Sequence, residues 1–356
     1  MTNNLKQLLN DKGQGYCALI VSPENRKYFT EFSSSDGFLL VSADRAVFIV
    51  DGRYIEAAEK QIDACEVMLL GKKLYPQLAE ILKEMNCRHL LVESTKMTVS
   101  TYNSLKGVLK NISISTDSTL DTLINSLRSI KTVGEVESII KAQRIAEAAF
   151  QHILKFIKVG VTEKEIALEL DFFMLRNGGE GLSFETIAVS GKNSSMPHGV
   201  PSDKKIENGD FITLDFGTII NGYHSDMTRT IAVGFATDEM KNVYDTVLNA
   251  QNNCLNNISA GVSCKDGDEF ARSVIRESGF GQYFTHSTGH GVGVEIHEYP
   301  NLSPASDSIL QVGNIVTVEP GIYIPEKFGV RIEDMALITE TGCQNLTTTP
   351  KELIIL

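Results

Sequence analysis

The chain has 356 residues, of which 42% are hydrophobic and 22% charged, and its net charge is −12. These values predict a folded protein of about two domains, or one large one, and exclude disorder and collagen-like repeats. The acidic balance, without any Lys/Arg run, argues against nucleic acid or an anionic membrane as a partner. No apolar run approaches the ~18 residues of a membrane span, and the first residues are too polar for a signal peptide, so we expect a cytoplasmic protein.

The first third of the chain alternates between strand-like and helix-like segments. Helices are predicted at 53–62 and 75–85, where apolar residues recur three or four positions apart. Short apolar runs predict buried strands at 16–21, 37–41, 46–50, 67–70 and 89–93. This alternation predicts an α/β domain over residues 1–125, ending near the polar stretch 113–121.

Residues 126–356 have a different pattern. A long amphipathic helix is predicted from Val136 to Phe156, and Thr162 with Glu165 fits a capping box for a second helix that ends near Arg176. Beyond residue 181, strand-like segments dominate and are interrupted by helices at about 238–257 and 266–278. Helices and mainly antiparallel strands that are segregated along the chain predict an α+β domain.

Asp215 lies inside a segment, FITLDFGTII, that otherwise reads as a buried strand. An unpaired buried carboxylate costs several kcal/mol, so such a group is hydrogen-bonded, ion-paired or bound to a metal. For a single residue, a satisfied structural aspartate is the commoner case. The pairing of this strand with its successor decides between the two interpretations.

The dipeptide Asn221-Gly222 predicts a tight type I′ hairpin turn and thereby sets the register of the two strands. In that register Asp215 faces Thr228, and Asp226 becomes a diagonal neighbour of Asp215 on the same face, about 7–8 Å away. A slip of one residue would send the two acids to opposite faces. Two carboxylates this close repel each other unless a cation lies between them.

The same feature recurs downstream. Glu319 ends the apolar run NIVTVEPG and Glu333 lies in GVRIEDMALIT, which reads as one acid in each of two sequential strands. Between the two acidic hairpins, the Gly-rich segment HSTGHGVGVEIHE contains three histidines. A lone histidine is usually a core residue, but five of the chain's seven histidines fall between positions 198 and 297 (His198, His224, His286, His290 and His297).

Four carboxylates and one imidazole indicate the kind of metal site. They are too many ligands for a simple catalytic zinc ion and too few for two separate full shells, so they suit two metal ions that share bridging carboxylates. Two divalent cations would also balance the four negative charges. Oxygen-dominated ligation with one imidazole and no thiolate favours Mn²⁺, Co²⁺, Fe²⁺ or Zn²⁺.

These residues resemble the five-ligand set of the pita-bread metallopeptidases, the family of methionine aminopeptidase, aminopeptidase P, prolidase and creatinase. The contexts LDFG, YHSDMTRT, GHGVG, VEPGIY and RIEDM contain, in this order, Asp215, Asp226, His290, Glu319 and Glu333. HSTGHGVGVEIHE resembles the signature of the proline-peptidase branch, and MPHG around His198 resembles its substrate-site motif. The segment 30–54 is similar to the creatinase-like N-terminal domain of that branch. The resemblance therefore implies such a domain at 1–125 and a pita-bread catalytic domain at 126–356.

The implied activity is hydrolysis of the bond between an N-terminal residue and a following proline in short peptides. Two divalent ions, Mn²⁺ first and Co²⁺, Zn²⁺ or Fe²⁺ as alternatives, would activate a bridging water and stabilise the oxyanion. Glu319 would be both a metal ligand and the acid/base. The catalytic set implied alongside it is His198 and His297, which bind substrate, His286, which shapes the proline pocket, and Arg331.

Several alternatives stay open at this point. Arg331 would orient the ligands, bind a substrate carboxylate or form an ordinary strand salt bridge. The resemblance implies a homodimer, in which Arg53 or Tyr54 reaches the partner's substrate or stays engaged in its own domain. A catalytically inactive relative and a creatinase-like, metal-free C–N hydrolase are alternative functions, but both predict lost ligands. Xaa-Pro aminopeptidase and Xaa-Pro dipeptidase share the ligand set, so the ligands do not separate them.

Overall fold

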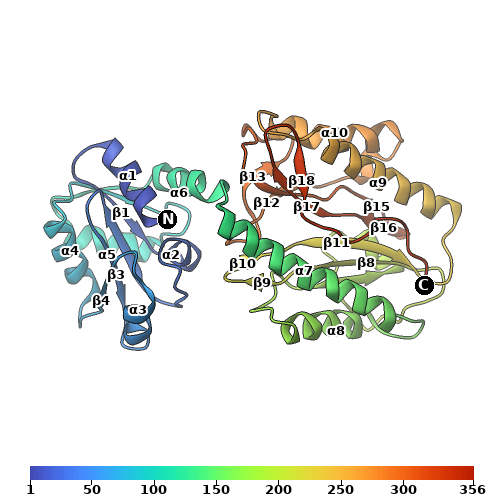
Figure 1. Ribbon diagram of the computed structural model, residues 1–356, viewed down its shortest axis with the longest axis horizontal. Coiled ribbons are helices and arrows are strands. Elements are labelled where there is room, and N and C mark those ends of the chain that lie inside the picture. The colour runs from blue at the N-terminus through green and yellow to red at the C-terminus, as the bar shows by residue number, and fades with distance from the viewer. The chain divides into compact units, whose positions relative to one another are not determined.

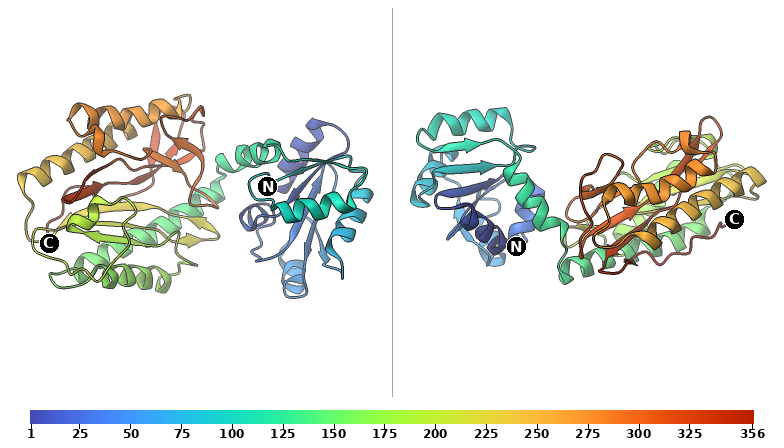
Figure 2. Two further views of the ribbon diagram at one scale, coloured as in Figure 1. Left: turned by 180° about the vertical axis from the view of Figure 1, so that it is seen from behind. Right: turned by 90° about the horizontal axis from the view of Figure 1, so that it is seen from above.

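The computed structural model describes residues 1–356, which form two compact units, Met1–Arg128 (unit 1) and Ser129–Leu356 (unit 2). Figure 1 labels their elements and Figure 2 gives two further views. No helix combines the length and the apolar character needed to cross a membrane. The division into an N-terminal α/β unit and a C-terminal α+β unit agrees with the predicted fold class.

Unit 1 is built on one six-stranded mixed sheet with the strand order β4-β3-β2-β1-β5-β6. The pairs β1/β2 and β2/β3 are antiparallel and the other pairs are parallel. Its strands are β1 (Tyr16–Ile20), β2 (Phe38–Ser42), β3 (Ala46–Val50), β4 (Glu66–Leu69), β5 (His89–Val92) and β6 (Ser113–Ser115). Its helices are α1 (Thr2–Lys12), α2 (Pro23–Thr30), α3 (Ile55–Gln61), α4 (Leu74–Glu84), α5 (Val99–Val108) and α6 (Thr119–Ser129).

The polar stretch 113–121, predicted as the end of the first domain, instead continues its structure. It contains β6, which pairs in parallel with β5 at the edge of the sheet, and the beginning of α6. The prediction missed β6 because this short edge strand, Ser-Ile-Ser, contains no apolar run. Short polar strands are a common way of ending a sheet without exposing an aggregation-prone edge.

In unit 2 two pairs of helices flank the strands (Figure 1). One pair is α7 (Val133–Phe156) and α8 (Glu163–Arg176), and the other is α9 (Asp238–Asn257) and α10 (Cys264–Glu277). Capping boxes begin the first two helices: Thr132 with Glu135 on α7 and, as predicted, Thr162 with Glu165 on α8. Each box satisfies backbone N–H groups that a helix start leaves without partners.

The strands of unit 2 pair only in antiparallel fashion within their sheets. A three-stranded sheet has the order β11-β8-β7, a five-stranded sheet has the order β13-β12-β14-β17-β18, and β9/β10 and β15/β16 form two ribbons. The strands are β7 (Ile187–Ser190), β8 (Phe211–Phe216), β9 (Ile219–Ile220), β10 (Tyr223–His224), β11 (Met227–Ala232), β12 (Gly289–Gly291), β13 (Glu298–Leu302), β14 (Ile315–Val318), β15 (Gly321–Ile324), β16 (Phe328–Arg331), β17 (Asp334–Ile338) and β18 (Cys343–Asn345).

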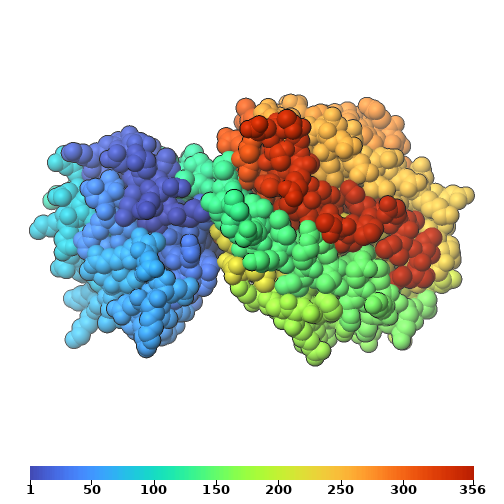
Figure 3. Space-filling model, viewed as in Figure 1, coloured from blue at the N-terminus to red at the C-terminus, as the bar shows by residue number.

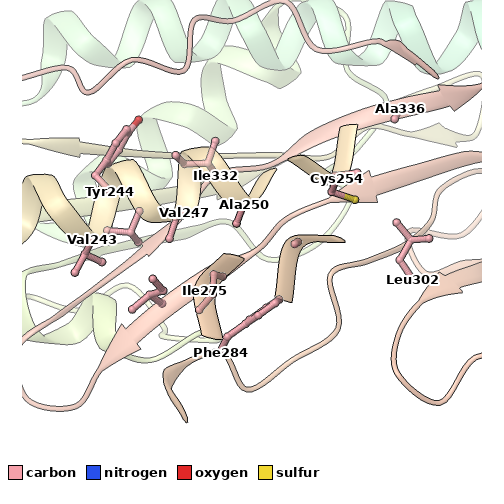
Figure 4. Packing of buried hydrophobic residues seen from close by; sticks show 14 of the residues in the cluster. Val243, Tyr244, Val247, Ala250, Cys254, Ile275, Phe284, Leu302, Ile332 and Ala336 are labelled. Carbon is pink, nitrogen blue, oxygen red and sulfur yellow. The ribbon is translucent and has the colours of Figure 1, made fainter. Parts of the chain in front are cut away.

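A continuous apolar core holds the second helix pair against the five-stranded sheet and the β15/β16 ribbon. Figure 4 shows side chains of α9, including Val247 and Cys254, beside Ile275 of α10 and Ala336 of β17. All four are fully buried. Since burial of a large apolar side chain contributes roughly 1.5–3 kcal/mol, this core gives β14 and β17 a rigid support.

The C-terminal segment crosses the surface of unit 2 between α7 and α9 (Figure 3). The backbone N–H of Thr349 donates to the Glu147 carboxylate of α7 at 3.0 Å, and the Tyr244 hydroxyl of α9 donates to the Lys351 carbonyl at 2.9 Å. The segment therefore ties the two helix pairs together along one side of the unit.

Candidate metal centre

The hairpin that contains the first two acids has the predicted register. Tyr223 pairs with Ile220, and Thr228 of β11 pairs with Asp215 of β8. Asp226 lies between β10 and β11, and both aspartates are buried and line one cavity of about 650 Å³. The turn predicted from Asn221-Gly222 thus brings two carboxylates into one cavity.

Glu319 and Glu333 enter the same cavity from breaks between strands, not from within strands as predicted. The apolar segment around Glu319 divides into β14 and β15, and the segment around Glu333 divides into β16 and β17. Pro320 has no N–H to continue a ladder, and the chain moves there from the five-stranded sheet to the β15/β16 ribbon. Glu319 directly follows β14 and Glu333 directly precedes β17. The two glutamates are neighbours because the last residue of β14, Val318, pairs with the first residue of β17, Asp334.

His290 completes the cluster from β12. Its Nδ1–H donates to the Gly291 carbonyl at 3.1 Å, which leaves the Nε2 lone pair directed at the acids. Nε2 lies 3.3 Å from Glu319 Oε1 and 3.6 Å from Asp226 Oδ2. Burial lowers the pKa of His290 to about 4, so the imidazole is in its neutral, ligating form at pH 7.

The donor atoms fit divalent cations. One donor atom each of Asp226, His290 and Glu333 lie within 4.8 Å of one another. Asp215 Oδ1, Asp226 Oδ1 and Glu333 Oε1 are buried and have no hydrogen-bond partner. Buried carboxylate oxygens normally have a partner, and three such oxygens in residues that line one cavity are what bound hard cations would satisfy.

The pKa values of the acids in the cation-free cluster also indicate a cation site. Burial, followed by the neighbouring charges of Asp215 and Glu319, raises the pKa of Asp226 well above its ordinary value. Burial and the charge of Asp226 do the same to the pKa of Glu333, and burial raises the pKa of Glu319 to about 8. The site is therefore arranged to hold positive charge that the protein alone does not supply.

Arg331 is fully engaged behind the acids. Its guanidinium, with the residue 3% exposed, donates to Asp215 Oδ2 at 2.5 Å, to the Tyr323 hydroxyl at 2.9 Å and to Thr228 Oγ1 at 3.1 Å. The Thr228 hydroxyl in turn donates to Glu333 Oε2 at 2.6 Å. Among the alternatives left open for Arg331, the structure shows an ion pair with Asp215, one of the four acids.

Sequence reasoning missed Thr228 and Tyr323 as members of this network. Thr228 had a usable signal, because the predicted register makes it the cross-strand partner of Asp215. Tyr323 had none: it reaches Arg331 only because β15 and β16 form a ribbon, in which Gly321 pairs with Arg331.

The remaining predicted histidines line the cavity. His286 is fixed in one tautomer, since Nδ1–H donates to the Ser287 carbonyl at 2.8 Å and Nε2 accepts from the Tyr323 hydroxyl at 2.8 Å. The rings of His297 and His290 meet edge to face with centroids 4.4 Å apart. His198 and His297 are exposed and line the same cavity as the acids.

Arg53 and Tyr54 lie in unit 1 and have partners there. The Arg53 guanidinium pairs with Asp36 and Asp51, each at 2.6 Å, and the Tyr54 hydroxyl lies 2.9 Å from Ser35 Oγ. Both side chains are thus already engaged within their own unit.

The chain is similar to known proteins over nearly its whole length. The model of metallopeptidase family M24 matches residues 137–340, and the model of the creatinase/prolidase N-terminal domain matches residues 2–130. An Xaa-Pro dipeptidase of Pyrococcus furiosus is 39% identical over 94% of each chain. The solved structure of an Xaa-Pro dipeptidase from Bacillus anthracis is 44% identical with a TM-score of 0.95, covering 100% of this chain and 99% of the other. That of an X-Pro aminopeptidase from Thermotoga maritima is 35% identical with a TM-score of 0.93 and the same coverage.

Proposed function

Because the chain belongs to metallopeptidase family M24, and to its members with a creatinase/prolidase N-terminal domain, we propose that it is a dinuclear metallopeptidase specific for Xaa-Pro bonds. The observation that carries the proposal is the convergence of four carboxylates and His290 on one cavity, with three buried carboxylate oxygens left without partners. The inactive and metal-free alternatives predict lost donors, and all five donors are present.

The proposed ligands of two divalent ions are Asp215, Asp226, His290, Glu319 and Glu333. Bound there, the ions would supply an activated water and a positive charge for the oxyanion. Mn²⁺ is our first choice, with Co²⁺, Zn²⁺ and Fe²⁺ as alternatives, because oxygen donors outnumber the single imidazole. We extend the proposal to a cytoplasmic homodimer, as the sequence resemblance implies.

Glu319 is the proposed acid/base. Its carboxylate lines the cavity at the proposed metal site, with Oε1 3.3 Å from His290 Nε2, and a carboxylate beside an activated water can act as its general base. It would accept the proton of the attacking water and deliver it to the proline nitrogen as the peptide bond breaks. That delivery matters because the nitrogen of an Xaa-Pro bond is a tertiary amide with no proton of its own.

The histidines of the wall have separate proposed roles. His198 and His297 are exposed to the cavity and would donate to the scissile carbonyl as it gains negative charge. His286 is held by Tyr323 and by the Ser287 carbonyl, so it would act as a fixed side of the proline pocket.

His198→Ala is expected to lower kcat by about 10²-fold or more while both metal ions stay bound. His198 is exposed in the cavity wall and forms no hydrogen bond with the four acids or with His290, so its loss should leave the proposed metal ligands in place. Elemental analysis of the purified variant, beside its kcat on Ala-Pro-Ala, checks the prediction. Loss of metal from the variant would show that His198 belongs to the metal site.

The direct test uses metal-stripped enzyme. After dialysis against EDTA, Mn²⁺ or Co²⁺ is added with Ala-Pro or Ala-Pro-Ala as substrate, and Ala-Ala-Ala serves as the control without proline. We expect metal-dependent release of alanine from at least one proline peptide and little from the control. If neither proline peptide is cleaved with either metal, the proposed function is wrong.

A further inference from the structure

The charges of the cavity wall bear on which proline peptides the site accepts. All lining residues come from unit 2. Five of them are acids, namely the four proposed metal ligands and the exposed Glu185. The lining contains no lysine, and its one arginine is Arg331.

Arg331 is not available to an incoming anion. The residue is 3% exposed, and its guanidinium already donates to Asp215, to the Tyr323 hydroxyl, to Thr228 and, at 3.2 Å, to the Pro197 carbonyl. Reaching a substrate would break an ion pair buried behind the proposed metal site, which is costly. The wall therefore has no free cation.

Apart from the acids and Arg331, the polar side chains that line the cavity are an amide, imidazoles and hydroxyls. β13 has alternating burial, so Tyr299 and Asn301 share its exposed face while Glu298 and Leu302 point inward. Asn301 lies in the cavity wall together with His198 and His297. An amide and imidazoles suit a peptide carbonyl or N–H, and they do not compensate a full negative charge as a guanidinium does.

The geometry points to an aminopeptidase: the site selects Xaa-Pro peptides that continue beyond proline over free Xaa-Pro dipeptides. This inference rests on the proposed function. In a dipeptide the proline ends in a carboxylate. Glu185 is the one exposed acid or guanidinium of the wall, since the four ligand acids and Arg331 lie deeper in the cavity. The carboxylate would then meet a like charge and no cation, whereas a continuing peptide places a neutral amide there.

The test compares Ala-Pro, Ala-Pro-NH₂ and Ala-Pro-Ala at pH 8, above the ordinary histidine pKa of ~6.5. Ala-Pro and Ala-Pro-NH₂ have the same size and differ in charge. We expect kcat/KM to be at least about tenfold higher for the amide and for the tripeptide than for Ala-Pro. Equal or faster cleavage of Ala-Pro overturns the inference but not the proposed function. Cleavage of none of the three overturns the proposed function itself.

Three variants at two positions test the cause. Asn301→Arg places a cation in the wall and is expected to raise the Ala-Pro to Ala-Pro-NH₂ ratio of kcat/KM by about tenfold. Asn301→Gln, which keeps an uncharged amide, should leave that ratio where it is. Glu185→Gln removes the wall's extra negative charge and should raise the ratio several-fold, independently of whether Asn301→Arg folds. If neither charge change moves the ratio, the inferred basis of selectivity is wrong.

Discussion

Asp226→Asn is expected to abolish activity and metal binding and yet to stabilise the metal-free protein. Asp226 is 4% exposed, one of its oxygens has no partner, and the charges of Asp215 and Glu319 act on it. In the proposed site it supplies a ligand, so its loss should reduce kcat by about 10³-fold or more. Without metal it supplies only a buried charge among like charges, and a neutral amide removes that repulsion.

The sign of the effect with pH follows from the raised pKa values. The pKa of Glu319 rises from an ordinary 4.5 to about 8, and those of Asp226 and Glu333 also rise. A folded acid with a raised pKa binds protons that the unfolded chain has released, so its stabilisation is complete below about pH 4.5 and is lost as pH rises to about 8. Metal-free wild type should therefore lose stability across that window, and Asp226→Asn should lose less.

Thermal unfolding in EDTA between pH 5 and 8.5 measures how the stability of the metal-free protein falls with pH. Unfolding with excess Mn²⁺ measures how much bound ions stabilise the protein. Ions that bind only the folded state raise the Tm of wild type but leave Asp226→Asn nearly unchanged. Asp203→Asn is the matched control, because Asp203 is exposed and forms a surface pair with Lys164 at 3.0 Å. An Asp226→Asn protein that is less stable than wild type in EDTA at pH 8, or that still gains stability from Mn²⁺, would contradict the prediction.

The hairpin register was predictable because it depends on local residues. The Asn221-Gly222 turn accommodates backbone with φ of 53° and 77° at its two central positions, and few other pairs do so easily. Once the turn is fixed, each residue of one strand has a set partner on the other, so the partner of Asp215 follows without any tertiary information. Strands β1 to β5 of unit 1 and the capping box at Thr162 were predictable for the same reason.

The course of the chain around Glu319 and Glu333 was not predictable in this way. Both segments read as single strands because apolar residues lie on both sides of each acid, but each divides between two different sheets. Which ladder the residues after Pro320 join depends on the partner strand, β16, and not on the segment itself. Pattern reasoning therefore found the two acids and misplaced the strands around them.

The role of Arg331 could not be decided from the sequence because its partners are distant along the chain. Asp215 lies 116 residues away and Thr228 lies 103 residues away. Local pattern says that an arginine two residues from an acid sits near the site, but it does not say whether the guanidinium faces substrate or an acid. Only the packing of β8, β11 and β16 settles that it faces Asp215.

A second arginine behind the cluster leads to the largest expected loss of stability. Arg229 is 1% exposed, and its guanidinium donates to Asp334 Oδ1 at 2.8 Å and to the Glu333 carbonyl at 2.6 Å. It also donates to the carbonyls of Thr349 and Pro350, at 2.8 and 3.1 Å, in the C-terminal segment. This one side chain therefore joins β11, the start of β17 with the residue before it, and the chain's last segment.

Arg229→Met is expected to lower the free energy of unfolding by about 3–5 kcal/mol. Asp334 is fully buried, and although burial opposes it, Arg229 and Lys351 together hold the pKa of Asp334 below its ordinary value. Without Arg229 the Asp334 carboxylate keeps Lys351, at 3.0 Å, as its one cationic partner, and the carbonyls that Arg229 bound lose a donor in a buried site.

Urea unfolding at pH 7 in EDTA measures the loss directly. Arg229→Lys is the matched variant, because it keeps the charge near Asp334 but cannot reach several carbonyls at once, so its loss should lie between wild type and Arg229→Met. Since Arg229 also holds the Glu333 backbone, Mn²⁺ affinity measured by calorimetry should fall in Arg229→Met. A variant as stable as wild type would mean that the buried network is held by the backbone and not by Arg229.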